Sequence, residues 1–362
     1  MKYYLNRHRL GVQMMIVALL WLLSSGALTT TGNLVLVNYL EKRLLMTSPK
    51  AGATIAAQLV FQREGVLEKA RKCDPFIHTY RIAVYNKERN HRPNEKKIMQ
   101  MCGDSDALCF FLVRTPLDRI VSSYIHTMRT TTPFPFKIIA KKGKRKGYTN
   151  QALTANQKLN VTFAGFVSQL DNITDQAILN RHCPSCNHFL PQSSNTLSKI
   201  QKNAPGKIKF ITTECLLPGG VNAMYEEFGY DLREDKSSSV VAEATAYLEK
   251  THYIEKNSSV APDDNVASWP FSRFTKEGSQ SMYSKCDKID PFYQRNVGNV
   301  PDYKRFLDDS SIAKVVCRLF TADVALYRTA CRQQWLRDRS AACATSCDRE
   351  VARLDSICGL DQ

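Results

Sequence analysis

Two segments of the chain join a short apolar run to a helical pattern. Residues 44–46 are apolar, the run ends at Pro49, and residues 54–60 then repeat apolar side chains at helical spacing. Residues 108–113 form an uninterrupted apolar run, as in a strand buried on both faces, and residues 117–125 again show helical spacing. Each segment therefore predicts a strand, a tight turn and a helix, and the first of these helices runs from Thr54 to about Ala70.

Weaker patterns predict the remaining elements. Residues 207–212 indicate a strand, and residues 312–327 carry apolar side chains on one helical period. Pro133 and Pro135 end the helix that follows residue 113. The other predicted elements are a strand within 76–85 and helices at 163–170, 175–179, 218–228 and 240–252.

The turn of the first segment, PKAGAT at residues 49–54, has the composition of an anion-binding site. A strand–turn–helix junction directs backbone N–H groups and the positive end of the helix dipole at one spot. Lys50 adds a positive charge there. The letters do not match the GxxxxGK[ST] of a Walker A loop, and an ordinary Pro/Gly turn is the alternative interpretation.

The second segment places an arginine and a serine where they can share one phosphate. Arg114 directly follows the apolar run, and Pro116 suits the first turn of the next helix. Ser122 lies on that helix, eight residues after Arg114. A surface arginine and an ordinary helical serine are the alternative for each residue taken alone.

In this order and about sixty residues apart, the two segments resemble the sulfotransferases that use 3′-phosphoadenosine 5′-phosphosulfate (PAPS). The closest resemblance is to the membrane-bound Golgi branch that sulfates carbohydrates. It implies an α/β fold with a P-loop-like central parallel sheet flanked by helices, and no metal. In that family PKxGxT binds the 5′-phosphosulfate and VRxPxxRxxSxY binds the 3′-phosphate. The residues implied to bind PAPS are Lys50, Ala51, Gly52, Ala53, Thr54, Arg114 and Ser122; Ala53 and Thr115 depart from the usual family pattern.

A histidine is the candidate base. Sulfuryl transfer to a hydroxyl needs a group that takes the proton, and histidine suits this near neutral pH. The Golgi enzymes carry an HxxPQ-like element after the 3′-phosphate site, which His188, Pro191 and Gln192 match. His188 is therefore the preferred catalytic base, His182 is the alternative, and two structural histidines are the non-catalytic interpretation. Lys50 is the second catalytic candidate, since its charge would stabilise the leaving phosphate oxygen.

Charge points to anionic partners. The 362 residues include 50 basic and 34 acidic side chains, for a formal charge of +16, and no zinc-finger spacing, RNP box or basic zipper accompanies it. Residues 137–146 read KIIAKKGKRK. We interpret this run as a clamp on an acidic acceptor, with a solvated loop as the alternative. The expected partners are therefore PAPS and a glycan, acidic or neutral, and not a nucleic acid.

The N-terminus predicts entry into the secretory pathway. Basic residues precede a stretch from 10 to 40 that has no charged side chain, and about 20 apolar residues span a bilayer. We expect a cytosolic tail (1–9), a signal-anchor helix (10–30), a short stem (31–43), a lumenal domain (44–335) and a cysteine-containing tail (336–362). The resemblance implies a single-pass type II protein of the Golgi membrane. The alternative is a cleaved signal peptide, because Ser25-Gly26-Ala27 resembles a cleavage site.

Glycosylation sequons and cysteines agree with a lumenal address. Sequons begin at Asn160, Asn172 and Asn257, and twelve cysteines would mostly pair in an oxidising compartment. Cys183 and Cys186 form a CPSC motif, for which one disulfide or two separate disulfides are favoured over a zinc or redox site. Cys109 is expected as a buried core thiol, and the last three cysteines as a disulfide-stapled tail: Cys343, Cys347 and Cys358.

Two other function classes stay open from the sequence. One is another nucleotide-using Golgi enzyme, because Asp104-Ser105-Asp106 has the letters of a glycosyltransferase DxD motif. The other is a non-catalytic, basic carbohydrate-binding protein that has the same fold. The acceptor, its hydroxyl position, the disulfide connectivity and the oligomeric state cannot be read from the sequence.

Overall fold

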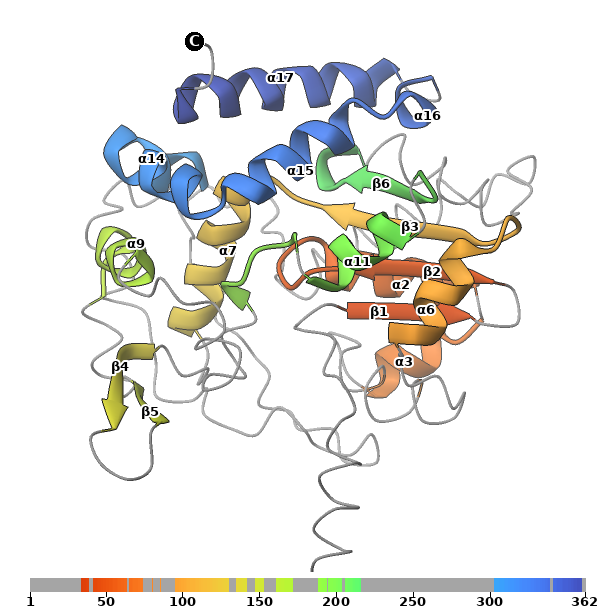
Figure 1. Ribbon diagram of the computed structural model, residues 1–362, viewed down its shortest axis with the longest axis horizontal. Coiled ribbons are helices and arrows are strands. Elements are labelled where there is room, and N and C mark those ends of the chain that lie inside the picture. Colours follow the sequence, from red (N-terminus) through yellow and green to blue (C-terminus); the bar gives the residue numbers. More distant parts are fainter. Residues whose placement is uncertain are drawn as a thin grey trace, which may run out of the picture.

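The computed structural model shows an α/β fold built on one small sheet (Figure 1). The structure describes residues 34–38, 42–63, 65–73, 80, 85, 95–129, 135–141, 147–152, 161–171, 188–193, 195–203, 206–215, 303–338 and 341–359. The predicted anchor, the asparagines of the three sequons, His182 and the CPSC motif lie outside these residues. So do the helices predicted at 175–179, 218–228 and 240–252. Within the described residues, no helix is long and apolar enough to cross a membrane.

The sheet has the strand order β1-β2-β3-β6. Strands β2 (Arg43–Thr47), β3 (Leu108–Val113) and β6 (Ile208–Thr212) are parallel, and β1 (Leu34–Asn38) pairs antiparallel with β2 at the edge. Nearly every residue of the three parallel strands is buried, because helices cover them. The predicted strands at 44–46, 108–113 and 207–212 are therefore confirmed. Their carboxyl ends meet at one edge of the sheet, where the predicted site residues follow them.

Helices flank this sheet (Figure 1). Helix α15 packs on β3 and β6, and α2 packs on β1 and β2. The helices are α2 (Ala53–Arg63), α3 (Leu67–Cys73), α6 (Glu95–Gly103), α7 (Pro116–Arg129), α9 (Phe163–Asp171), α11 (Asn195–Asn203), α14 (Ser310–Leu319), α15 (Thr321–Cys331), α16 (Gln334–Arg337) and α17 (Ala341–Cys358), with short 3-10 turns η3 (Thr213–Cys215) and η6 (Tyr303–Leu307).

An aromatic cluster fills the core between α7, α9 and η6. The Tyr124 ring contacts the rings of Phe163, Phe166 and Phe306 at centroid distances of 5.3 to 5.9 Å. Phe189 packs edge-on against Phe166 at 5.3 Å. The segment that begins at His188 is thereby fixed to the core by its second residue.

Several expectations need correction. The helix predicted from Thr54 to about Ala70 is two helices, because Gly65 adopts a left-handed φ of 68° between α2 and α3. The helix predicted at 312–327 is also broken, at Phe320, into α14 and α15. The first part of the basic run is not a loop, since Pro135–Lys141 forms β4, paired with β5 (Gly147–Ala152).

Two further differences concern the ends of the sheet. Part of the predicted stem, Leu34–Asn38, is strand β1. Cys109 is not a thiol but forms a disulfide with Cys102 of α6, at a Cα–Cα distance of 5.9 Å. Burial of Cys109 was predicted correctly, but its partner lies on a helix that the sequence pattern did not show.

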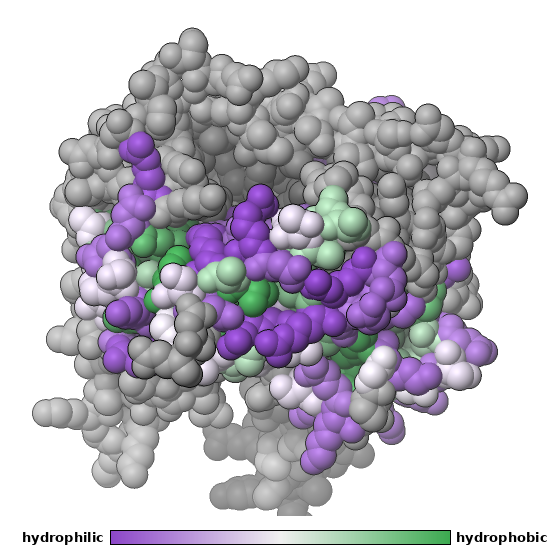
Figure 2. All heavy atoms as spheres, turned by 90° about the horizontal axis from the view of Figure 1, so that it is seen from above, coloured by the Kyte–Doolittle hydropathy of each residue, from purple (hydrophilic) through white to green (hydrophobic). Residues whose placement is uncertain are grey.

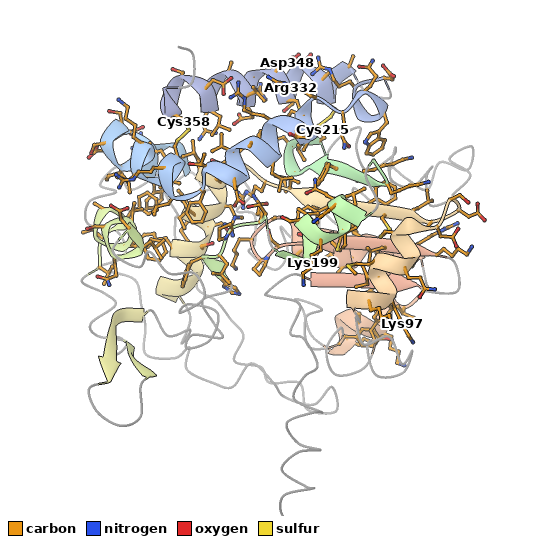
Figure 3. The ribbon with its side chains drawn as sticks, in the orientation of Figure 1. Lys97, Lys199, Cys215, Arg332, Asp348 and Cys358 are labelled. Atoms are coloured by element: carbon orange, nitrogen blue, oxygen red, sulfur yellow. A yellow bond between two sulfur atoms is a disulfide. The ribbon has the colours of Figure 1, made fainter. Side chains whose placement is uncertain are left out.

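The last helix, α17, packs on the rest of the domain. Cys343, Cys347 and Leu354 belong to the main hydrophobic core, and disulfides join Cys215 to Cys343 and Cys317 to Cys358. Figure 3 shows Cys215 beneath one part of α17 and Cys358 at its far end. The face seen from above, over α17, carries mostly hydrophilic side chains among the described residues (Figure 2).

Candidate functional site

The turn after β2 has the backbone of an anion cradle. Lys50 and Gly52 adopt left-handed φ angles of 66° and 80° on either side of Ala51. The Ala51 N–H donates to the Ser48 carbonyl at 3.1 Å, and the buried Thr47 hydroxyl donates to the Ala51 carbonyl at 2.8 Å. Such alternation of backbone conformations turns successive N–H groups toward one side, which makes a concavity for anions.

Helix α2 begins directly after this turn, at Ala53. The Gly52 carbonyl accepts from the Ala56 N–H at 3.0 Å, so the hydrogen-bond pattern of the α-helix begins at Gly52. Its first turn contains no acidic residue. The positive end of the helix dipole therefore adds to the charge of Lys50 without an acidic side chain competing for it.

Arg114 joins the two predicted phosphate motifs. It follows β3 at the same sheet edge, and its Nη1 donates to the Lys50 carbonyl at 3.1 Å. The guanidinium group is thereby fixed beside the turn. Two segments separated by 64 residues in sequence thus place Lys50 and Arg114 side by side.

Other residues of the second motif have structural roles. The Thr115 hydroxyl accepts from the Asp118 N–H at 3.1 Å, so Thr115 is the N-cap of α7 and Pro116 its first residue. Tyr124 donates to the Val161 carbonyl at 2.7 Å, and burial raises the pKa of its hydroxyl. These two residues build the helix and the core rather than the phosphate site.

The HxxPQ segment is attached to Arg114 through its backbone. Gln192 is fully buried; its Oε1 accepts from the Arg114 N–H at 2.9 Å, and its Nε2 donates to the Arg114 carbonyl at 2.7 Å. A side-chain amide thus pairs with the residue directly after β3 as a neighbouring strand would. The segment that carries His188 therefore lies next to the turn that carries Lys50.

A buried ion pair holds the same segment from the other side. Arg119 of α7 and Asp323 of α15 have fully buried side chains, with Nη2 3.3 Å from Oδ2. Arg119 also donates to the Leu190 carbonyl at 2.6 Å, while Asp323 accepts from the backbone N–H groups of Gln192 and Ser193 at 2.8 and 2.9 Å. Arg119, the second arginine of the VRxPxxRxxSxY motif, therefore positions the HxxPQ segment.

His188 is mostly buried between positive charges. Burial, and then the charges of Lys50 and Arg119, lower the pKa of its imidazole to about 3. The histidine is therefore neutral at physiological pH, as a proton acceptor must be. Its backbone carbonyl accepts from the Ser123 hydroxyl at 2.7 Å, which fixes its position against α7.

The remaining predicted residues are placed in part. Ser122 lies on α7 with a half-buried side chain, whereas Ser123 is fully buried and bonds to Arg119 and His188. Ala51 is buried in the turn, and Thr54 lies in the first turn of α2 with a side chain outside the described part. The structure thus brings together Lys50, Arg114 and His188, and a phosphate contact of Ser122 remains a prediction.

Asp323 is the residue that sequence reasoning missed. It lies inside the apolar pattern predicted at 312–327, three residues after Phe320 and four before Tyr327, both of which are buried. An acidic side chain on the buried face of a helix needs a buried partner. That position was a signal for a buried cation, although nothing in the sequence identified Arg119.

The DxD letters lie away from this site. Lys42, just before β2, pairs with Asp104 at 2.7 Å and with Asp106 at 3.7 Å, at the amino end of the parallel strands. This ion pair lowers the pKa of the Asp104 carboxyl. The motif is at the opposite edge of the sheet from Lys50 and Arg114, which gives the glycosyltransferase alternative no support.

The residues at the carboxyl edge fit the phosphate groups of PAPS. They supply two cationic side chains, a helix start without acidic residues and a left-handed turn, and Asp323, which accepts from the HxxPQ segment, is paired with Arg119. Neither the curated proteins nor the solved structures gave a match to the chain. The family model described as sulfotransferase family matches residues 28–214, just over half of the 362 residues and all four strands of the sheet. The chain therefore belongs to the sulfotransferase family.

Proposed function

We propose that this protein transfers a sulfuryl group from PAPS to a hydroxyl group of a carbohydrate. Membership of the family implies sulfuryl transfer and PAPS as the donor. The carbohydrate acceptor and the roles of the individual residues are our proposal. The observation that supports those roles best is the 3.1 Å contact between Arg114 and the Lys50 carbonyl, which unites the two phosphate motifs.

The cationic residues would hold the donor by its two phosphorylated ends. The turn from Lys50 to Thr54 would bind the 5′ end, and Arg114 with Ser122 the 3′-phosphate. When bound, PAPS supplies the sulfuryl group, which passes to the acceptor oxygen as the bond to the 5′-phosphate oxygen breaks. Lys50 would stabilise the negative charge that develops on that phosphate oxygen.

His188 would take the proton of the acceptor hydroxyl. Its neutral imidazole lies close enough to Lys50 for the lysine charge to lower its pKa. The buried contacts of Gln192 and Asp323 orient the segment, so positioning would be built in before the acceptor arrives. The proton leaves the hydroxyl as its oxygen attacks sulfur, and the histidine becomes an imidazolium.

The acceptor class is supported by charge and by the resemblance. The HxxPQ element resembles the Golgi enzymes that sulfate carbohydrates, and a net charge of +16 favours an acidic polymer over a neutral small molecule. A panel of desulfated glycosaminoglycans, neutral oligosaccharides and a phenol, each incubated with PAPS, would test this. Sulfate incorporation into the phenol alone would contradict the carbohydrate acceptor and leave the family assignment intact.

We also propose a Golgi location with an N-terminal anchor at residues 10–30 and a lumenal catalytic part. The charge-free stretch after a basic N-terminus and the three sequons support this topology. A mass decrease of the cellular protein after peptide N-glycosidase treatment is expected. A protein without N-linked glycans that co-localises with cytosolic markers would contradict the proposal.

Replacing Arg114 with alanine should weaken PAP binding, where PAP is the desulfated donor. Loss of a partly buried charge-assisted contact costs about 2–5 kcal/mol, so Kd should rise roughly 30-fold or more. Calorimetry on the wild type and the variant measures this. Arg332→Ala is the matched control, because that arginine is exposed at the end of α15. Equal affinity of the Arg114→Ala variant and wild type would remove Arg114 from the donor site.

The pH profiles of kcat/KM and kcat should differ, because they report the pKa of His188 in the free enzyme and in the donor complex. With a pKa of about 3 for His188 in the free enzyme, kcat/KM for PAPS should show no loss of activity on the acid side near pH 6.5, because the base stays neutral there. Bound phosphates would oppose the charge of Lys50 and raise the pKa of His188, so the acid limb of kcat should lie at higher pH. Rates between about pH 4 and pH 8 test this. Identical limbs near pH 6.5 in both profiles would contradict it.

A further inference from the structure

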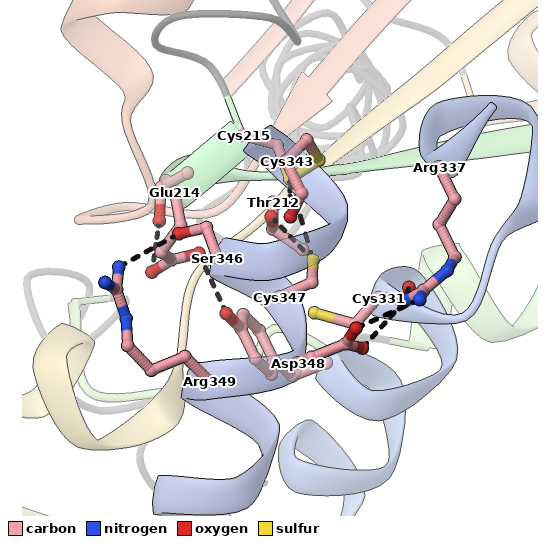
Figure 4. The surroundings of a disulfide bond; sticks show 12 residues. Thr212, Glu214, Cys215, Cys331, Arg337, Cys343, Ser346, Cys347, Asp348 and Arg349 are labelled. Carbon is pink, nitrogen blue, oxygen red and sulfur yellow. Dashed lines mark hydrogen bonds and ion pairs between the residues drawn. A yellow bond between two sulfur atoms is a disulfide. The ribbon is translucent and has the colours of Figure 1, made fainter. Parts of the chain in front are cut away.

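Four buried cysteines meet where α17 packs on α15 and on the end of β6 (Figure 4). Cys215 ends η3 after β6, Cys331 ends α15, and Cys343 and Cys347 lie one turn apart on α17. All four side chains are at most 2 % exposed. Cys215 and Cys343 form a disulfide with a Cα–Cα distance of 4.8 Å.

The other two sulfur atoms are thiols in contact. Among the described residues, Cys331 and Cys347 are the cysteines outside a disulfide. The side chains of Cys331 and Cys347 lie close together at the contact of α15 with α17 (Figure 4), and their interaction is the largest cause of the raised pKa of Cys331 and of the lowered pKa of Cys347. The Cys347 sulfur also lies 3.6 Å from the Cys215 sulfur and 3.6 Å from the Thr212 hydroxyl.

We propose that Cys331 and Cys347 form a second disulfide beside Cys215–Cys343 in the mature protein. Both thiols lose their protons and a sulfur–sulfur bond forms. The two electrons and two protons pass to a protein or small-molecule disulfide of the secretory pathway, which becomes two thiols. The oxidising compartment is the one proposed above, and the pairing itself comes from the contact between α15 and α17.

Two other uses of these sulfur atoms fit less well. Thiolates are good zinc ligands, and the sulfur atoms of Cys215, Cys343 and Cys347 lie within 4.8 Å of one another, but two of them are already bonded. Exchange with that bond requires in-line attack. The sulfur–sulfur bond is about 2 Å long. In-line attack of the Cys347 sulfur on the Cys215 sulfur, 3.6 Å away, would therefore put it more than about 5 Å from the Cys343 sulfur, whereas the three sulfur atoms lie within 4.8 Å of one another. Cys347 therefore lies to the side of the bond.

The proposed disulfide would stabilise the position of α15, the helix that holds the HxxPQ segment in place. Helix α15 carries Asp323, which holds Gln192 and Ser193, and Tyr327, which donates to Glu214 at 3.0 Å. Glu214 lies in η3, two residues after the end of β6, at the edge of the sheet where the site lies. The proposed bond would fix the end of α15 to α17. The Cys215–Cys343 disulfide already joins α17 to η3 after β6, so the three elements would be linked covalently.

The test is a disulfide map of the full chain, produced in secretory eukaryotic cells. The protein is denatured with N-ethylmaleimide and without reductant, digested and analysed by mass spectrometry. The expected result is a cross-linked peptide pair that joins Cys331 to Cys347, with no maleimide on either. Maleimide on both residues, Cys347 joined to Cys215 or Cys343, or about one tightly bound zinc ion per chain would overturn the proposal.

Cysteine variants provide a second test of the Cys331–Cys347 bond that does not depend on enzymatic activity. Cys331→Ser should add one maleimide, on Cys347, and Cys347→Ser should add one on Cys331. The double variant Cys331→Ala/Cys347→Ala should keep Cys215–Cys343 and melt several degrees below the wild type. A double variant with an unchanged Tm and the thiols labelled in the wild type would refute the bond. The map needs neither PAPS nor an acceptor, so a failed sulfotransferase assay leaves this result unaffected.

Discussion

Replacing Lys50 with alanine should lower kcat for sulfuryl transfer by about 100- to 1,000-fold. The lysine charge lies in the turn that would hold the 5′ end of PAPS, where negative charge develops on the leaving oxygen. Alanine keeps the Cβ atom, so the left-handed φ of 66° at this position costs the variant about as much as the wild type. Steady-state kinetics with saturating donor measures the loss.

Lys42→Ala is the matched control for this experiment. Lys42 also has a left-handed φ, of 52°, and it precedes the strand that Lys50 follows. Its ammonium group pairs with Asp104 at the opposite edge of the sheet. We expect this variant to keep wild-type turnover. Equal turnover of the Lys50→Ala variant and this control would contradict the catalytic role of Lys50.

Replacing Asp323 with alanine should cost about 3–5 kcal/mol of unfolding free energy. The change leaves the buried Arg119 charge without its carboxylate, and it removes the acceptor for the N–H groups of Gln192 and Ser193. The His188 segment should then shift, so kcat should fall even where the variant remains folded. Urea unfolding followed by circular dichroism, and kinetics on the folded fraction, measure the two effects.

Asp348→Ala provides the comparison. Asp348 pairs with Arg337 at 2.8 Å on the surface, with 63 % of its side chain exposed, and such pairs contribute about 1 kcal/mol or less. The double variant Arg119→Met/Asp323→Leu should recover the part of the lost stability that comes from the unpaired Arg119 charge, because apolar side chains of similar volume can replace a buried pair, whereas the Gln192 and Ser193 N–H groups still lose their acceptor. A stable Asp323→Ala variant with wild-type kcat would show that the segment is held by other contacts.

Local patterns predicted the parts of the site that local sequence builds. The turn around Lys50, the strand before Arg114 and the helix that begins at Pro116 were all predicted at the positions where they occur. Gln192 was found through the HxxPQ letters, although its role is to pair with the backbone of Arg114 rather than to bind a ligand. These features depend on residues within one turn or strand, which is why they can be read directly.

Contacts over long sequence distances could not be read in this way. The Arg119–Asp323 pair joins residues 204 positions apart, and Cys109 pairs with a helix whose pattern was too polar to predict. The break at Phe320 was hidden because α14 and α15 bury apolar side chains with almost the same period. Such features arise from packing between elements, and a single sequence does not show which elements will meet.

The folded domain is longer than the segment that matches the family model, because helices after residue 214, up to α17, pack on its core. The family match ends at residue 214, yet Asp323, Cys343 and Cys347 lie beyond it and are buried against the matched part. A recombinant fragment cut at residue 214 would keep every proposed donor contact and lose the carboxylate that orients the histidine. Boundaries for expression, for domain exchange with other sulfotransferases and for tolerated truncations should therefore be set after α17.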